Sequence, residues 1–222
     1  VLNQHPRSAL VPDSLLALGE MSYDDHKFAD ALEFFIRIEK YPESRVYTYG
    51  MYKAAWAYYN RKDNDNAINK LVQVVKLQDP SNGPDGSHNV NLSLRSESLR
   101  DLAIFYGETR PASDAYNFFN KIASTDEVGE AMINLGKLYD SHSRFKEMNI
   151  FLADFIDRQP TSKYRIKAEI LMINGNETAR DRGEALKHII SANDTCQAGS
   201  RWRKANPTIA ESECDYDFAK VN

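Results

Sequence analysis

The stretch YPESRVYTYGMYKAAWAYYN, residues 41–60, decides the fold of this chain. It joins a Pro-x-Ser turn to a run that places small residues in the middle of an expected helix. The same turn occurs three times, as Pro6-Arg7-Ser8, Pro42-Glu43-Ser44 and Pro160-Thr161-Ser162. Proline ends a preceding helix and serine is a favoured N-cap, so each turn predicts a boundary between two helices.

Counting from these turns indicates a repeat with five copies. Thirteen residues after the three prolines lie the mid-helix residues Gly19, Ala55 and, as the exception, Ile173; the corresponding residues of the other two copies are Ala103 and Gly136. Twelve residues later come Ala31, Ala67, Ala115, Met148 and Ala185. Four residues after these come Phe35, Leu71, Phe119, Leu152 and Ile189. Small residues let two antiparallel helices approach closely, and the large residue fills the space beside them.

This pattern resembles the tetratricopeptide repeat, a helix–turn–helix unit of about 34 residues. The fourth copy agrees best, with Leu135, Gly136, Tyr139, Phe145 and Pro160 at the spacing of the family. The fifth departs from it, with Ile173 and Asn176 where a small residue and Tyr are usual. The resemblance implies an all-α, right-handed α-solenoid of about five helix–turn–helix repeats over residues 8–193. An unrelated helical bundle is the alternative.

The repeat predicts how the chain is organised. The five repeats are expected at about 8–43, 44–78, 92–125, 126–160 and 161–193. Residues 79–91 read DPSNGPDGSHNVN, which is loop chemistry and predicts an insertion between two repeats. Residues 1–7 look like the end of a preceding repeat, because they match the chain before Pro42. Residues 194–222 predict a C-terminal cap or tail, in which Trp202 packs and 209–221 form a short helix.

The predicted core follows the repeat. Stacking buries the apolar face of each helix pair against the next one, which a lone pair cannot do. We expect these residues to be buried: Leu18, Ala31, Phe35, Ala55, Leu71, Ala103, Phe119, Leu135, Gly136 and Leu152.

Composition excludes several classes of function. The net charge is −4, from 28 Lys and Arg against 32 Asp and Glu, which favours neither nucleic acid nor an anionic membrane as a partner. No apolar run is long enough to span a bilayer. The five histidines are scattered, and the calcium-loop-like start at 63–66 lacks the required glycine and glutamate. With no phosphate-binding loop or nucleophile elbow, we expect no enzyme, no metal, no cofactor and no small-molecule substrate.

One aromatic stripe is the candidate binding site. Tyr49, Tyr52, Trp56 and Tyr59 recur at steps of three, four and three, so they line one side of a helix. The resemblance implies that these positions face the concave groove of the array, with Glu20 and Arg100 beside them. Their polar tips can stay wet, and rings of this kind are favoured at interaction hot spots. We expect a largely apolar protein segment as ligand; the alternative is that a neighbouring repeat covers the rings.

The turn at 41–44 and the Tyr-rich helix after it resemble those of Gram-negative envelope proteins with this repeat. That subgroup includes the outer-membrane assembly lipoprotein and the coordinator of the Tol–Pal system. The resemblance implies a periplasmic or outer-membrane-associated scaffold, with a cytoplasmic array as the alternative. A structural spacer in motility or secretion machinery, with no groove ligand, is the second functional reading.

The cysteines bear on the same question. Cys196 and Cys214 are the only two, and both lie in the non-repeat tail. In an exported protein we expect them to form a disulfide, and in a cytosolic one to be free thiols.

Overall fold

The computed structural model describes residues 8–82 and 92–214, and every regular element in them is helical. The all-α class is therefore confirmed for this part of the chain. The chain divides into two compact units, Val1–Thr109 and Arg110–Asn222. The boundary falls inside the third expected repeat, between its two helices. The expectations for 1–7, for most of the 79–91 insertion and for the end of the tail lie outside the described residues.

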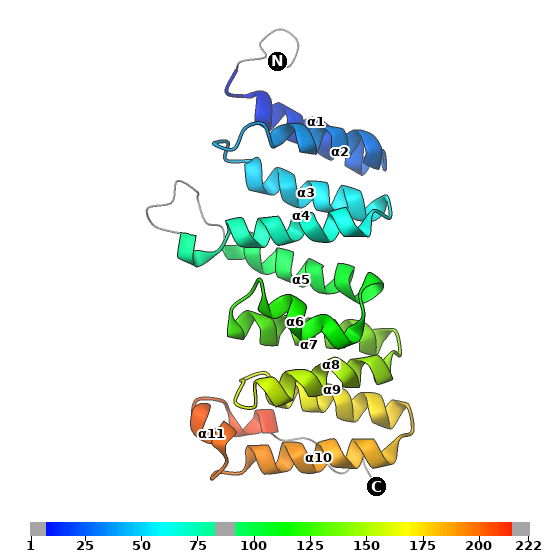
Figure 1. The fold of residues 1–222 in the computed structure, drawn as a ribbon, viewed down its shortest axis with the longest axis vertical. Coiled ribbons are helices and arrows are strands. Elements are labelled where there is room, and N and C mark those ends of the chain that lie inside the picture. Colours follow the sequence, from blue (N-terminus) through cyan, green and yellow to red (C-terminus); the bar gives the residue numbers. More distant parts are fainter. Residues whose placement is uncertain (1–7, 83–91, 215–222) are drawn as a thin grey trace. The chain divides into compact units, whose positions relative to one another are not determined.

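The first unit is a series of antiparallel helices in which each packs on the next (Figure 1). Its elements are α1 (Val11–Asp24), α2 (Phe28–Ile38), α3 (Tyr47–Asn60), α4 (Asn64–Leu77), the 3-10 turn η1 (Pro80–Asn82) and α5 (Leu92–Thr109). Helix α3 also contacts α1 and α5, the helices two places before and after it. This order is the one that stacked helix pairs require.

The second unit contains two long helix pairs and a short helical cap. Its elements are η2 (Ala112–Asp114), α6 (Ala115–Asn120), α7 (Thr125–Ser141), α8 (Phe145–Arg158), α9 (Arg165–Thr178), α10 (Arg182–Cys196), α11 (Arg201–Ala205) and η3 (Glu211–Cys214). Helices α7 and α8 form one pair, and α9 and α10 the next. The only described part of the helix expected at 209–221 is the single turn η3.

The small and large positions of the repeat meet as expected. A Cβ atom added to Gly19 would lie 2.4 Å from Cε1 of Phe35, a fully buried ring on α2. At Gly136 it would lie 2.9 Å from Leu171 and 3.4 Å from Leu152. The contacts under 3.0 Å, to Phe35 and Leu171, leave no room for a methyl group, so glycine sets how closely these helices approach.

Nine of the ten residues expected in the core are buried, and Leu18 is not. Leu18 is 36% exposed, although the equivalent Ala54, Leu102 and Leu135 are fully buried. Ala54 is covered because α3 packs on α2 of the preceding pair. No helix precedes α1 in the described residues, so the same position there stays open to solvent.

The serines of the Pro-x-Ser turns are not N-caps, which corrects the sequence prediction. The caps are Leu10, Val46 and Tyr164, two residues further on. Each serine instead makes an additional turn ahead of its helix. The Oγ atoms of Ser8, Ser44 and Ser162 accept the N–H of the residue two places later, at 3.2–3.3 Å. Their carbonyl groups accept the N–H three places later, at 3.0–3.1 Å. Each helix therefore starts two residues later than it would with the serine as its N-cap.

The turns inside the repeats share a second device that sequence reasoning did not find. His26, Lys62, Ser143 and Arg180 have φ between 56° and 64°, and each lies seven residues after the mid-helix position. The next residue donates its N–H to the carbonyl five residues earlier, at 2.8–3.0 Å, which is the Schellman closure of a helix. Glycine, the usual residue for this conformation, is absent from all four positions, so no sequence signal marked them.

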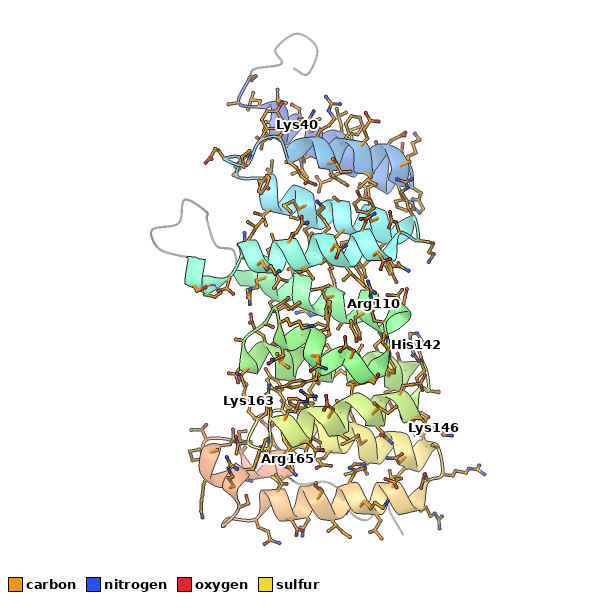
Figure 2. All side chains as sticks on the ribbon, viewed as in Figure 1. Lys40, Arg110, His142, Lys146, Lys163 and Arg165 are labelled. Carbon is orange, nitrogen blue, oxygen red and sulfur yellow. A yellow bond between two sulfur atoms is a disulfide. The ribbon has the colours of Figure 1, made fainter. Side chains whose placement is uncertain are left out.

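The fifth pair has a polar core where the others are apolar. Leu15, Met51, Leu99 and Met132 occupy one equivalent position in the first four pairs, and all are buried. The fifth has Glu169 there, 1% exposed. Its carboxylate accepts a hydrogen bond from Oγ of Ser191 at 2.6 Å and lies 3.0 Å from Nδ1 of His188. A guanidinium nitrogen of Arg165, which begins α9 (Figure 2), is 3.7 Å away. These donors offset the cost of burying the charge.

We expect Gly19→Ala to lower the free energy of unfolding by about 1–2 kcal/mol, because the added methyl group must displace the Phe35 ring. Without that contact, alanine would raise it through helix propensity. Gly183→Ala is the matched control, since its nearest neighbour would be 3.7 Å away. It should stabilise by about 0.5 kcal/mol. Urea titrations of the two variants measure both changes in the free energy of unfolding. Changes of the same sign would contradict this account.

Candidate protein-interaction surface

Helix α3 presents two faces to different surroundings. Met51, Ala54 and Ala55 are buried on its core side, and Tyr58 is partly buried there. The aromatic stripe of Tyr49, Tyr52, Trp56 and Tyr59 lies on another side. Tyr49 is 37% exposed, and the other three are partly exposed. The rings are therefore neither core nor freely hydrated side chains.

The polar tips of the stripe are bound by acids, which corrects the expectation that they stay wet. The hydroxyl of Tyr52 and the indole N–H of Trp56 both donate to Oδ2 of Asp101 on α5, at 2.8 and 2.9 Å. The hydroxyl of Tyr59 donates to Glu108, two helical turns further along α5, at 2.5 Å. The hydroxyl of Tyr49 makes a longer contact, 3.4 Å, to Glu20 on α1.

The rings also order one another. Tyr49 and Tyr52 stack with centroids 6.0 Å apart, and Tyr59 lies parallel to the buried Phe105 of α5 at 4.1 Å. Trp56 packs edge-on against both Phe105 and Tyr59, at 5.1 and 5.6 Å. Neighbouring helices therefore hold the stripe by ring packing and hydrogen bonds together, and less side-chain entropy remains to be lost on binding.

The two charged residues predicted beside the stripe have different surroundings. Glu20 contacts Tyr49 and lies 3.7 Å from Nζ of Lys53, whose ammonium group is 4.9 Å from the ring centre of Tyr23. Arg100 is exposed on α5 and acts electrostatically on Asp101. The structure thus places Glu20 against the stripe and Arg100 at its α5 border.

Asp101, Phe105 and Glu108 belong to this surface, and sequence reasoning missed all three. They come from α5, which follows the insertion, and a contact between α3 and α5 depends on how the helices stack. The one available signal is their spacing of four and three, which puts them on one side of α5.

Burial changes the ionisation of this cluster. Removal from water raises the pKa of Asp101, although the hydrogen bonds from Tyr52 and Trp56 act in the opposite direction. Burial also raises the pKa of the Tyr52 hydroxyl, and its hydrogen bond to Asp101 adds to the effect. Burial and then the bond to Glu108 raise the pKa of Tyr59 to about 12. Both phenols therefore remain donors at neutral pH.

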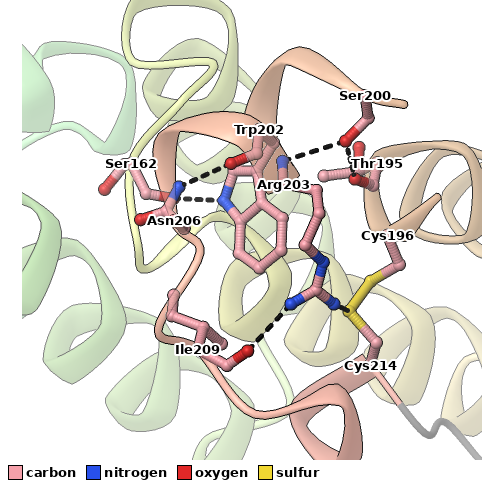
Figure 3. The surroundings of a disulfide bond; sticks show 9 residues. All are labelled: Ser162, Thr195, Cys196, Ser200, Trp202, Arg203, Asn206, Ile209 and Cys214. Atoms are coloured by element: carbon pink, nitrogen blue, oxygen red, sulfur yellow. Dashed lines mark hydrogen bonds between the residues drawn. A yellow bond between two sulfur atoms is a disulfide. The ribbon is translucent and has the colours of Figure 1, made fainter. Parts of the chain in front are cut away.

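The C-terminal cap is built around a disulfide between Cys196 and Cys214 (Figure 3). Trp202 of α11 is only 2% exposed and donates its indole N–H to the carbonyl of Ser162 at 2.7 Å. Arg203 donates to Sγ of Cys214 at 3.1 Å and to the carbonyl of Ile209 at 2.8 Å. The packing expected of Trp202 is thus confirmed, and the cap is fastened to the turn that starts α9.

The described residues contain neither a candidate membrane span nor a candidate metal site. No helix among them is long and apolar enough to cross a membrane. Nor do their His, Cys, Asp and Glu side chains form a group of three placed to hold a metal ion. His142, for example, is the C-cap of α7, at the turn before α8 (Figure 2).

Residues 49–80 match a family model described as tetratricopeptide repeat. They cover most of α3 and all of α4, so the helix pair that carries the aromatic stripe is the part of the chain that is similar to this family. No curated protein matches the chain.

Among solved structures, the chain is similar to the crystal structure of the Podosopora anserina putative kinesin light chain nearly identical TPR-like repeats. The identity is 14% and the TM-score 0.43, over 82% of this chain and 93% of that chain. A crystal structure of a point variant of the same Podosopora anserina protein gives 15% identity and a TM-score of 0.43, with coverages of 85% and 94%.

Replacement of Asp101 should separate its charge from its role as an acceptor. Its raised pKa means that the stability contributed by the protonated form is full below the unfolded value of 3.8 and is lost as pH rises through the folded value. Asp101→Asn keeps an oxygen that can accept both hydrogen bonds. We expect the free energy of unfolding of this variant, relative to that of the wild type, to increase between pH 4 and neutrality.

Asp101→Ala, which leaves the Tyr52 and Trp56 donors without their acceptor, should cost about 1–3 kcal/mol. Denaturant titrations across this pH range measure both effects. A pH-independent difference between the Asn variant and the wild type would contradict the assignment.

Proposed function

We propose that this chain is a non-enzymatic protein–protein interaction scaffold that binds a segment of a partner protein on the aromatic stripe of α3. One observation carries the proposal. The repeat that matches the family model also holds four half-exposed aromatic rings in place through contacts with α1 and α5. Rigid aromatic side chains supply contact area at low entropic cost, which is why they are enriched at hot spots.

The stripe corresponds to the positions that the family resemblance assigns to the concave groove. On this proposal Tyr49 and the ring faces of Tyr52, Trp56 and Tyr59 touch the partner. Glu20 and Arg100 border the contact on either side.

We further propose that the scaffold works in a bacterial envelope assembly, in the periplasm or associated with the outer membrane. The disulfide between Cys196 and Cys214 supports export, because such bonds persist in oxidising compartments and are rare in the cytosol. A cytoplasmic scaffold is the alternative location.

The second candidate function is a structural spacer or adaptor with no ligand on this stripe. The observation in its favour is that the polar tips are already engaged within the chain. The two functions differ in whether an exposed ring of the stripe contributes to the affinity for a partner: it does in the scaffold and does not in the spacer.

Tyr49→Ala is the sharpest variant for this test. Tyr49 is the most exposed ring of the stripe, and alanine there would remove one long hydrogen bond and the stacking on Tyr52. Alanine at Tyr52 or Trp56 would instead remove a donor from buried Asp101. We expect Tyr49→Ala to weaken capture of the partner at least tenfold with little change in melting temperature.

Cross-linked pull-down from the native organism identifies the partner, and titration with the purified partner measures its affinity. Ile36→Ala on α2, where the side chain is 38% exposed, is the matched control and should bind normally. Equal binding by both variants would favour the spacer.

The state of the cysteines tests the location. Mass spectrometry without reductant, on protein isolated from its native compartment, should find Cys196 and Cys214 linked. Cys196→Ser should then lower the free energy of unfolding by about 3 kcal/mol, because the bond closes a short loop in the unfolded chain. Two free thiols in the native protein would remove the support for export.

A further inference from the structure

The aromatic stripe is bordered by a line of carboxylates on α5. Glu97, Asp101 and Glu108 are separated by four and seven residues, so they lie within about 40° of one another around the helix axis. Asp101 and Glu108 accept the hydrogen bonds from the stripe, and Glu97 acts electrostatically on both Tyr49 and Tyr52. Glu20 adds a fourth carboxylate from α1. We call these four acids and the four rings the aromatic–acidic surface.

Few cations offset these charges. Lys53 is held by Glu20 with only 18% of its side chain exposed. Neither Glu97 nor Glu108 makes an ion pair with any residue that the structure describes, and both are exposed. Arg100 is the one described cation on α5 that acts on Asp101. The carboxylates of Glu97 and Glu108 therefore lie, without an ion pair from the described residues, beside partly exposed aromatic rings.

Two lysines of the chain itself lie beside tyrosine rings in or next to this surface. The ammonium group of Lys53 lies 4.9 Å from the centre of Tyr23, and that of Lys62 lies 5.7 Å from the centre of Tyr59. Both distances are within the range of cation–π attraction. Because the hydroxyls of Tyr52 and Tyr59 donate to carboxylates, the negative charge lies close to the ring edges and draws a cation to the same place.

We propose that the aromatic–acidic surface binds an extended peptide segment that carries Lys or Arg side chains within an otherwise apolar stretch. This inference rests on the proposed function and names the chemistry of the partner. One cation sits between Glu97 and the rings of Tyr49 and Tyr52, and a second beside Glu108 and Tyr59. Charge complementarity selects this occupant over an acidic or a neutral segment.

The geometry also sets the spacing of the two cations. Eleven residues of helix separate Glu97 from Glu108, which is roughly 16 Å at 1.5 Å per residue. An extended chain covers about 3.3 Å per residue, so the two basic side chains belong about five residues apart.

Synthetic peptides provide a direct test with an internal reference. The probe is a ten-residue peptide of Leu and Gly, acetylated and amidated, with two Lys residues five positions apart; matched peptides carry Gln, Glu, or two Lys only two positions apart. The protein has two tryptophans, so two-dimensional NMR gives two indole N–H signals. Trp56 donates to Asp101 within the surface, and Trp202 is buried in the cap of the other unit. The five-spaced Lys peptide should shift the Trp56 signal and leave that of Trp202 in place.

We expect the Gln peptide to bind at least tenfold more weakly than the Lys peptide, and the Glu peptide not to bind. The peptide with its two Lys residues only two positions apart should lose most of the affinity that the Lys peptide gains over the Gln peptide. The double variant Glu97→Gln and Glu108→Gln keeps the acceptor for Tyr59 and should weaken the Lys peptide about tenfold. Glu33→Gln, at an exposed acid of α2, removes a comparable charge elsewhere and should have no effect.

Equal binding of the Lys and Gln peptides, or a Lys peptide insensitive to the double variant, would overturn the inference. A different result would contradict the proposed function, namely a native partner that binds the Tyr49→Ala variant as tightly as the wild type. If binding of that partner requires Tyr49 but not Glu97 and Glu108, the proposed scaffold function is supported and the proposed cationic ligand is wrong.

Discussion

The close approach of antiparallel helices at small residues governs the rest of this structure. Gly19 on α1 faces the Phe35 ring on α2 with no space for a methyl group between them. A small residue opposite a large one brings the two helices together, and each pair then offers one apolar face to the next. At Gly136 on α7 the same restriction applies to the approach of α9, because an added methyl group would meet Leu171. Burial of Ala31, Leu71 and Leu135 follows from this approach, because a wider gap would leave cavities that a close-packed interior does not tolerate.

Two backbone devices keep the pairs in register. The Schellman closures after α1, α3, α7 and α9 reverse the chain within a pair, each through a non-glycine residue at positive φ. The strain of that conformation is small beside the packing that holds it. The serine turns before α1, α3 and α9 move the helix start two residues beyond the position that a serine N-cap would give. Before α3 and α9, these turns lie between one helix pair and the next.

The candidate surface is a consequence of this stacking. Helix α3 can bring its aromatic stripe to Asp101 and Glu108 only because α5 lies against it, two helices further along the chain. The hydrogen bonds then restrict the conformations of these side chains, which remain partly exposed to solvent. The polar core at Glu169 shows the opposite arrangement, in which a carboxylate in an apolar position is enclosed by its own donors. Acids at the two places thus serve different purposes, display of rings in one and internal compensation in the other.

The sequence alone determined the helical class, the repeat period, most of the core and the position of the aromatic stripe. These depend on local spacing, since side chains three, four and twelve residues apart occupy set places on a helix pair. Only the tertiary structure decided that Leu18 is exposed, that Tyr52 and Trp56 share Asp101, and that Glu169 is buried with its partners. Each of these depends on which helix lies against which, and residues 45 or 49 positions apart carry no periodic signal that relates them. The insertion before α5 hides that relation further, because it shifts the repeat by a length that no local rule sets.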